Sequence, residues 1–304
     1  MNKKVLITGA TGLIGSKLVT KLYDLGFKVY SISRDVKKSE KKFKVSIEHI
    51  SYDEDKFKNI IDNNTIIINL AGASIAGKKW TEEYKKEIYD SRILTTRKIV
   101  EILNIYELKP ELFINASAIG VYGNTFDKII DENSPCGEGF LAKVTIDWEN
   151  ELTKLSNNIR KVYARIGIVL DLEGGALAKM LLPYKLFIGG PLGTGKQWMS
   201  WIHIDDLIEL FVFIIQKNNI NGAINLTAPN PVTMDEFSHT IGKILRRPSF
   251  FKVPEFILKI ILGESSAMVL NSNRVIPKKA IENGYNFEYD NLEKALKNLL
   301  KKYQ

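Results

Sequence analysis

The chain contains very little cysteine and histidine. Among its 304 residues there is one cysteine, Cys136, and there are three histidines, His49, His203 and His239. A single cysteine excludes a disulfide framework and a cysteine-based metal site. The histidines lie far apart and lack the spacing of metal ligands. We therefore expect no metal site, and the absence of disulfides is typical of a reducing compartment.

Long apolar runs and a targeting segment are also missing. Charged residues interrupt each apolar stretch before it reaches the ~20 residues that a membrane span needs. The chain enters a strand-like run at once, without the apolar core of a signal peptide. We expect a cytoplasmic protein. Its length allows one large α/β domain or two smaller ones with cores of their own.

The charge balance is basic, with a net charge of +8. The lysines are scattered, with local clusters at 37–44 and near the C-terminus, and no basic motif is interleaved with aromatic residues. Solvated lysine-rich faces explain this pattern better than binding to nucleic acid or to an anionic membrane. We therefore expect neither as a partner. The sequence leaves open whether the protein is a monomer or a homodimer.

Three glycines follow the first apolar run. Gly9, Gly12 and Gly15 form a G-x-x-G-x-x-G pattern between a strand-like run at 5–8 and an amphipathic helical pattern. Gly9 would permit a tight turn, Gly12 would admit a pyrophosphate and Gly15 would allow close packing of helix and strand. A glycine-rich turn without a ligand is the alternative. The context favours a dinucleotide site that includes Gly9, Thr11, Gly12, Leu13, Ile14 and Gly15.

A basic residue follows the second strand-like run. Sites that prefer NAD carry an acidic residue about 20 positions past the glycines, where it binds the ribose 2′-hydroxyl. Arg34 holds that place here, beside Ser33, and Asp35 comes one position later. A guanidinium pairs well with a 2′-phosphate. The sequence therefore predicts NADP(H) at Ser33 and Arg34, although an exposed arginine at a strand end would look the same.

Strand-like runs alternate with helical patterns through the first two-thirds of the chain. This alternation predicts a doubly wound parallel sheet, a Rossmann-type α/β fold. The strand-like runs lie at 5–8, 29–33, 47–51, 66–70, 112–116 and 162–169, and the clearest helical patterns at 81–106 and 141–155.

The last third changes this rhythm. A helix at 206–216 and a strand at 223–227 return to the sheet, but the other segments are mostly helical. We expect a Rossmann domain over 1–170, joined by 201–228, and a smaller, mostly helical lobe formed by 171–200 and 229–304. The helices of that lobe are predicted at 174–185, 233–245, 255–262 and 291–302.

Several motifs resemble those of a known family. The glycine loop, the strand end at 69–72, the Val-Tyr-Gly tripeptide at 121–123 and the segment 201–206 resemble extended short-chain dehydrogenase/reductases. Three stretches are similar to an atypical branch, the bacterial epimerase family proteins, which carry a C-terminal domain of unknown function: 69–75, 189–198 and 274–278. The resemblance covers essentially the whole chain. It implies a Rossmann fold, NADP(H) and a nucleotide-sugar-like substrate.

The strand ends and the resemblance extend the predicted cofactor site. A small, glycine-containing strand end lets a dinucleotide lie against the backbone. The resemblance implies that Glu87 and Arg92 lie near the cofactor, although by themselves they are an ordinary exposed helix pair. The family lines its nicotinamide pocket at Gly167 and Ile168. The further cofactor residues expected here are Leu70, Ala71, Gly72, Glu87, Arg92, Ser117 and Ile168.

The catalytic triad of the resembled family is missing. Working members use a tyrosine as acid or base, a lysine that lowers its pKa, and a serine or threonine that orients the substrate. Those places are held here by Leu141, Thr145 and Ala118. Loss of the proton donor argues against ordinary carbinol oxidation unless other groups substitute, and the sequence does not identify the catalytic residue. A Tyr52–Lys56 pair has the right spacing but lies on the adenine side, so we interpret it as coincidence.

Other polar residues offer substitutes. Ser117, Tyr122, Lys143 and Asp147 lie nearby in sequence, although a strand-end cap, packing or surface charge explains each of them better than catalysis does. Substrate-binding candidates are Tyr122, Arg165, Lys196 and Trp198, the last two because they follow a glycine-rich loop.

Two other motifs are rejected. Residues 190–196 approach a phosphate-binding P-loop, but Gln197 stands where a Ser or Thr should bind magnesium. Asp205, in a His-x-Asp-Asp segment, is predicted to cap the helix that follows rather than to bind a metal.

Two hypotheses follow. The first is an NADP(H)-dependent oxidoreductase or epimerase that acts on a small polar metabolite. The second is a catalytically silent NADP(H)-binding protein that senses the cofactor or docks a partner.

Overall fold

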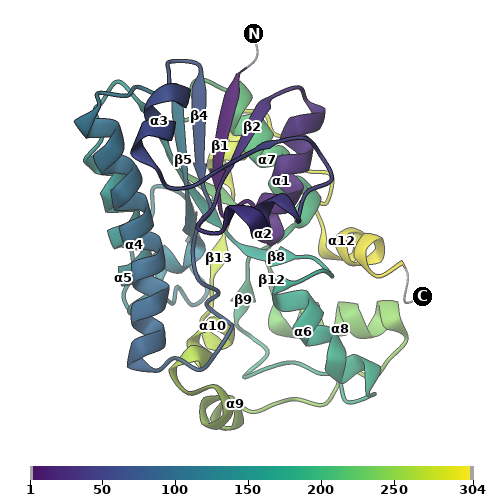
Figure 1. Ribbon diagram of the computed structural model, residues 1–304. Helices are drawn as coiled ribbons and strands as arrows, with labels where there is room; N and C mark the ends of the chain where they lie inside the picture. The colour runs from purple at the N-terminus through teal and green to yellow at the C-terminus, as the bar shows by residue number, and fades with distance from the viewer. Residues whose placement is uncertain (1–2, 302–304) are drawn as a thin grey trace.

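A seven-stranded parallel sheet forms the centre of the computed structural model, which describes residues 3–301 (Figure 1). The strand order is β11-β7-β5-β4-β1-β2-β3. The second and third strands are added on one side of β1 and the later strands on its other side, so the order of addition reverses between β1 and β4. The predicted doubly wound fold is confirmed. The strands are β1 (Lys4–Thr8), β2 (Lys28–Ile32), β3 (Glu48–Ile50), β4 (Thr65–Asn69), β5 (Leu112–Ala118), β7 (Arg160–Ile166) and β11 (Gly222–Leu226).

Helices cover both faces of this sheet. In β4 every residue is buried, and its side chains alternate between the two faces. Ile66 and Ile68 pack in the core beneath α1 (Leu13–Asp24) and α7 (Ile204–Gln216), whereas Ile67 packs in the core on the opposite face. That second face is covered by α3 (Glu54–Ile60), α4 (Glu82–Ile105) and α5 (Phe140–Thr153). Burial on both faces explains the continuous apolar runs of the strands.

The predicted strand at 162–169 is two strands. β7 ends at Ile166, and β8 (Ile168–Leu170) leaves the sheet to pair with β10 (Trp201–His203). Gly167 makes the break, because its amide binds the carbonyl of Leu226 (3.1 Å) while the next amide turns to the carbonyl of Ser200 (2.8 Å). A Cβ at Gly167 would lie 2.6 Å from the oxygen of Ser200, so only glycine fits.

A second core lies beyond the sheet. The fully buried Trp201 packs among side chains of α6 (Gly175–Lys185), α8 (Met234–Leu245) and α12 (Leu292–Leu299). The expected C-terminal helix begins as predicted, capped by Asn291, but ends at Leu299, and residue 302 lies outside the described part. The C-terminal region is mostly helical, and our boundaries for the smaller lobe remain a prediction. The remaining elements are α2 (Val36–Glu40), η1 (Ile119–Tyr122), β6 (Ile129–Ile130), β9 (Trp198–Met199), β12 (Val232–Thr233), α9 (Glu255–Leu262), η2 (Gly263–Ser266), α10 (Ala267–Leu270), β13 (Arg274–Val275) and α11 (Lys278–Glu282).

The start of α7 holds the C-terminal segment against the sheet. His203, not Asp205, is the N-cap, because its Nδ1 accepts the amide of Asp205 (3.1 Å). The prediction for Asp205 is therefore wrong: this side chain is exposed in the first turn. Asp206 is buried and accepts the amide of Tyr289 (2.8 Å). It also accepts the amide of Glu288 (3.0 Å) and the hydroxyl of Tyr285 (3.1 Å).

Two absences hold for residues 3–301. None of the described helices combines the length and apolar character needed to cross a membrane. The same residues contain no group of three or more His, Cys, Asp or Glu arranged to hold a metal ion.

We expect Asp206→Ala to lower the free energy of unfolding by about 3 kcal/mol, because it leaves two amides and a hydroxyl without their charged acceptor. Chemical denaturation measures the loss. Asp205→Ala is the matched control, with an expected loss below about 1 kcal/mol, since this carboxylate is exposed. Equal losses in the two variants would contradict the anchoring role.

Candidate functional site

The glycine loop packs tightly on the end of the neighbouring strand. Gly9 has a φ of 67°, and a Cβ there would lie 2.6 Å from the carbonyl oxygen of Leu70. A Cβ at Gly15 would lie 2.3 Å from the oxygen of Gly9. Neither position accommodates a side chain, so loop and helix lie directly against the strand ends. The predicted packing role of Gly15 is supported by this geometry.

The start of α1 leaves its backbone donors open. Its N-cap is Gly12, in extended conformation and without a side-chain cap, and its first turn contains no acidic residue. Thr11 is exposed beside it, and Leu13 and Ile14 form the first helical positions. The positive end of a helix dipole with uncapped amides attracts an anion such as a pyrophosphate.

A buried amide joins the strand ends beneath this loop. The Asn69 side chain accepts the hydroxyl of Thr8 and donates to Thr96 and Asn115, each at 2.7 Å. Thr8 in turn accepts the amide of Ala71 (3.2 Å). These bonds fix the backbone of Leu70 and Ala71 at the carboxyl edge of the sheet. Sequence reasoning used only the small residues of the strand end at 69–72. The signal for this hydrogen-bond network was Asn69, a polar residue at the end of an apolar strand.

Arg92 brings a cation without a carboxylate to the same edge. Its guanidinium donates to the carbonyls of Ala73 (3.1 Å) and Ile88 (2.9 Å) and lies 5.3 Å from the ring of Trp148. Burial lowers the pKa of Arg92 to about 10, so it stays charged at neutral pH. A Cβ at Gly72 would lie 3.0 Å from its Cζ atom. The strand end and Arg92 are thus brought together.

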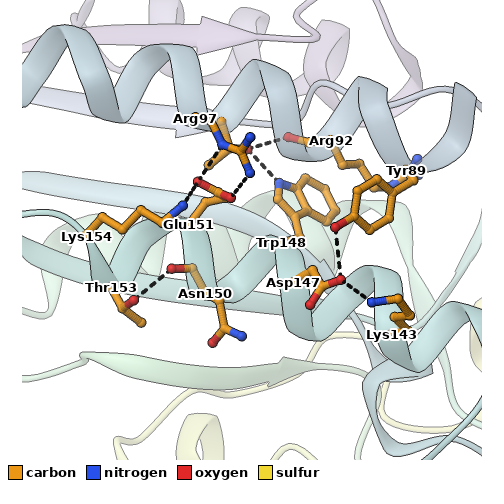
Figure 2. A network of polar contacts seen from close by, with 11 residues as sticks. Tyr89, Arg92, Arg97, Lys143, Asp147, Trp148, Asn150, Glu151, Thr153 and Lys154 are labelled. Atoms are coloured by element: carbon orange, nitrogen blue, oxygen red, sulfur yellow. Dashed lines mark hydrogen bonds and ion pairs between the residues drawn. The ribbon is translucent and has the colours of Figure 1, made fainter. Parts of the chain in front are cut away.

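The helix pair that carries this arginine is held by polar contacts (Figure 2). The indole of Trp148 on α5 donates to Thr96 on α4 (2.8 Å), and Thr96 donates to the carbonyl of Arg92 (2.8 Å). Asp147 accepts from Lys143 (2.9 Å) and Tyr89 (3.0 Å) at the surface of the pair. The hydrogen bond to Asp147 raises the pKa of Lys143. Lys143 and Asp147 thus pair with each other, as the surface-charge interpretation expects.

Arg34 lies exposed at the end of β2. Within residues 3–301 its guanidinium has no hydrogen-bond or ion-pair partner. Asp35 is committed elsewhere, because its side chain caps α2 by accepting the amide of Lys38 (3.0 Å). The Ser33 hydroxyl accepts the amide of Asp35 (3.1 Å). Glu87 is exposed on α4. At this strand end the exposed, unpaired side chain is therefore a cation, Arg34, and not a carboxylate.

The places of the catalytic triad hold no proton donor of the usual kind. Ala118 is the last residue of β5. Leu141 on α5 packs against Gly120: a Cβ added to Gly120 would lie 3.4 Å from the Cβ of Leu141. Thr145 is buried and donates its hydroxyl to the carbonyl of Leu141 (2.7 Å). The tyrosine place therefore carries the alkyl side chain of Leu141. The lysine place carries the hydroxyl of Thr145, which is already bonded to the backbone.

Three predicted site residues meet in one buried network, but each has a protein partner. Arg165 lies within β7 and makes a bidentate contact with Glu149, with both N–O distances 2.9 Å. Its third contact is the hydroxyl of Tyr122 (2.9 Å), which donates to Asn225 (2.8 Å). Ser117 donates to Glu149. Sequence reasoning missed Glu149, whose partners lie on other elements.

The electrostatics of this network favour a fixed ion pair. Although burial opposes it, the contact with Glu149 raises the pKa of Arg165. Burial raises the pKa of Tyr122 to about 12, so its hydroxyl stays protonated at neutral pH. We still only predict that Ser117, Tyr122 and Arg165 bind a ligand. In the structure their side chains bond to one another, to Glu149 and to Asn225.

The loop at 190–198 has a different arrangement. The buried Gln197 donates to the carbonyls of Leu192 (2.9 Å) and Val269 (3.0 Å), so it shapes the loop in place of a P-loop threonine. Trp198 donates to Asp127 (2.8 Å), and the Cζ atom of Arg274 lies 4.1 Å from the Trp198 ring. Lys196 is exposed. The structure thus adds Arg274 and Asp127 to the predicted pair of Lys196 and Trp198.

Ile168, which we predict to line the nicotinamide pocket, follows the break at Gly167 and is partly buried. Tyr52 packs with the core side chains under α3 and α4, while Lys56 is exposed on α3. The Tyr52–Lys56 pair therefore belongs to α3 and the residues just before it, whereas the triad places are on α5.

Comparison with known proteins agrees with this geometry. The NAD dependent epimerase/dehydratase family matches residues 5–227, and a domain of unknown function (DUF1731) matches residues 253–299. The chain belongs to the NAD-dependent epimerase/dehydratase family. The resemblance to its atypical epimerase family proteins is confirmed.

Similar proteins of this epimerase/dehydratase family span nearly the whole chain. The "epimerase family protein SDR39U1 homolog, chloroplastic" of Arabidopsis thaliana is 40% identical over 97% of this chain and 86% of its own length. Epimerase family protein YfhF of Bacillus subtilis is 40% identical over 97% of both chains. The crystal structure of human epimerase family protein SDR39U1 with NADPH is 30% identical, with a TM-score of 0.87 over 98% of this chain and 99% of the other.

We expect Arg165→Ala to lower the free energy of unfolding by about 3 kcal/mol or more, because Glu149 would remain buried without its cation. Arg97→Ala is the matched control. Arg97 also contacts a carboxylate, Glu151, but is itself largely exposed, and Lys154 still pairs with Glu151 after the change. Its expected loss is about 1 kcal/mol. Denaturation midpoints compare the two, and an Arg165 loss no larger than the Arg97 loss would contradict a structural network.

Proposed function

We propose that this protein binds NADP(H) at the glycine loop, with Arg34 at the 2′-phosphate. The observation that carries the proposal is the unpaired guanidinium of Arg34 at the end of β2. The neighbouring carboxylate, Asp35, caps α2 and is not free to bind a ribose. An NAD site would need a free carboxylate there. The NADPH bound by the human relative supports the same cofactor.

Arg92 fits the same ligand. A mostly buried cation without a carboxylate is costly to the fold unless an anion approaches it. Gly72 leaves its guanidinium accessible from the strand end, and the open amides of α1 lie across the same edge. We place the pyrophosphate between these groups. Glu87 would then lie at the outer rim.

We further propose an oxidoreductase or epimerase that acts on a small polar, nucleotide-sugar-like metabolite in the cytoplasm. Lys196, Trp198 and Arg274 supply two cations and an aromatic face for such a ligand, and the region formed by 171–200 and 229–304 would close over it. The free, exposed Cys136 suits a reducing compartment. The catalytic group is not one of the family's triad.

A silent NADP(H)-binding protein is the second candidate. The observation that favours it is Leu141 at the tyrosine place, where an alkyl side chain packs against Gly120 of η1. Removal of a general acid or base usually costs a factor of about 10² to 10⁴ in rate.

The cofactor assignment predicts that NADPH binds at least about tenfold tighter than NADH, because a guanidinium pairs with the 2′-phosphate. Arg34→Ala should remove most of this preference and leave NADH binding unchanged. Calorimetric titration of both nucleotides measures it. Lys41→Ala, which removes an exposed cation nearby on the same segment, is the control and should keep the preference. Equal affinities of the wild type for the two nucleotides would refute the assignment.

The substrate assignment predicts a polar, anionic small molecule in the purified protein beside NADP(H). Mass spectrometry after denaturation identifies it. Trp198→Ala should lose the metabolite but keep the cofactor, since it removes the aromatic face under Arg274. If repeated preparations contain cofactor alone, the silent protein is the better account.

A further inference from the structure

Helix α9 exposes half of its apolar side chains. Of its eight residues only Leu258 is buried, whereas Phe256, Ile260 and Ile261 are 63%, 74% and 55% exposed. The helix begins after Pro254, ends at Gly263, and forms the lower edge of the molecule in Figure 1. Large apolar side chains that gather on a surface mark an interaction site.

Two further segments continue this apolar surface. The amide of Phe251 binds the carbonyl of Gly189 (3.1 Å), and that of Gly193 binds the carbonyl of Val253 (2.8 Å), so the two segments run side by side. Both extend along the same lower edge (Figure 1). Each carries exposed apolar residues. We call the combined surface the basal patch, formed by Phe187, Ile188, Phe250, Phe251, Phe256 and Ile260.

The charged residues of the segment that carries most of this patch are nearly all positive. Residues 246–262 contain four cations, Arg246, Arg247, Lys252 and Lys259, and one carboxylate, Glu255. The Cζ atom of Arg247 lies 4.1 Å from the ring of Phe187, so charge and apolar surface are directly joined. Lys259 and Glu255 pair at 3.5 Å, which leaves an excess of positive charge.

We propose that the basal patch binds the surface of an anionic phospholipid membrane. The aromatic and aliphatic side chains enter the interface between headgroups and acyl chains, and the four cations contact the lipid phosphates. α9 is far too short to span a bilayer, so the contact is peripheral. This inference goes beyond the proposed function and does not depend on it.

Charge decides between possible occupants. A second copy of the chain would bring the same excess of cations against itself, and like charges across an interface oppose association. A membrane rich in anionic lipid supplies the opposite charge and an apolar layer together. The sequence predicted no membrane partner because its lysines are scattered along the chain. It did not show that the segment at 187–193 lies beside the basic, apolar segment at 246–262.

Flotation of the full chain with vesicles tests the proposal. We expect binding to vesicles of phosphatidylcholine mixed with phosphatidylglycerol to be at least about tenfold tighter than to phosphatidylcholine alone, and to weaken at high salt. The double variant Lys252→Ala/Lys259→Ala should lose about 25-fold, or about fivefold per cation. Lys98→Ala/Lys109→Ala, which removes two exposed lysines on and after α4, is the control and should bind as the wild type does.

The apolar part has its own variants. Phe256→Ser/Ile260→Ser should lose at least about tenfold in binding to the mixed vesicles, whereas Leu94→Ser/Ile105→Ser, at exposed positions of α4, should not. Circular dichroism and NADPH affinity check that each variant folds. Equal binding to both kinds of vesicle, or an unaffected Phe256→Ser/Ile260→Ser variant, would overturn the proposal. A concentration-dependent dimer that this variant abolishes would also overturn it, in favour of a second copy.

Discussion

The close approach of the glycine loop to the end of β4 is the constraint on which the rest of the site depends. Gly9 and Gly15 bring backbone against backbone where any side chain would collide. The Asn69 amide then holds the ends of β1, β4 and β5 at one level by accepting from Thr8 and donating to Asn115 and Thr96. The result is a carboxyl edge of bare backbone beside the open end of α1. Because backbone occupies this edge, an extended nucleotide can lie flat along it.

The distribution of partners among the arginines separates binding from structure. Arg165 is buried with a bidentate carboxylate and a tyrosine, so its charge is neutralised inside the protein. Arg92 is mostly buried with carbonyl partners only, and Arg34 is exposed without a partner at the strand end. A cation that the fold does not neutralise is available to a phosphate. The positions that would transfer a proton contain Leu141 and a satisfied Thr145 instead. This region therefore favours nucleotide binding more strongly than the usual proton transfer.

The sequence predicted what local patterns determine. The strand–loop–helix with Gly9 and Gly15, the alternation of elements, and the start of the last helix near Asn291 depend on neighbouring residues, so periodicity and spacing reveal them. The break at Gly167 was missed, because it arises from the distant carbonyls of Ser200 and Leu226.

Long-range partners explain the other omissions. Asp206 is buried by residues about 80 positions later, Glu149 finds its cation on another element, and Arg274 meets Trp198 only in the fold. A polar residue inside an apolar pattern was the available signal for Glu149 and Asp206, but it does not name the partner. For the same reason the basal patch could not be predicted, since its segments are adjacent only after folding.

The most direct test of the central claim is a crystal structure of the protein with NADP⁺. Our account predicts the pyrophosphate on the first turn of α1 with Arg92 nearby, and the 2′-phosphate within hydrogen-bonding distance of Arg34. A nucleotide whose 2′-phosphate points away from Arg34, or a nucleotide bound elsewhere than at the glycine loop, would contradict it.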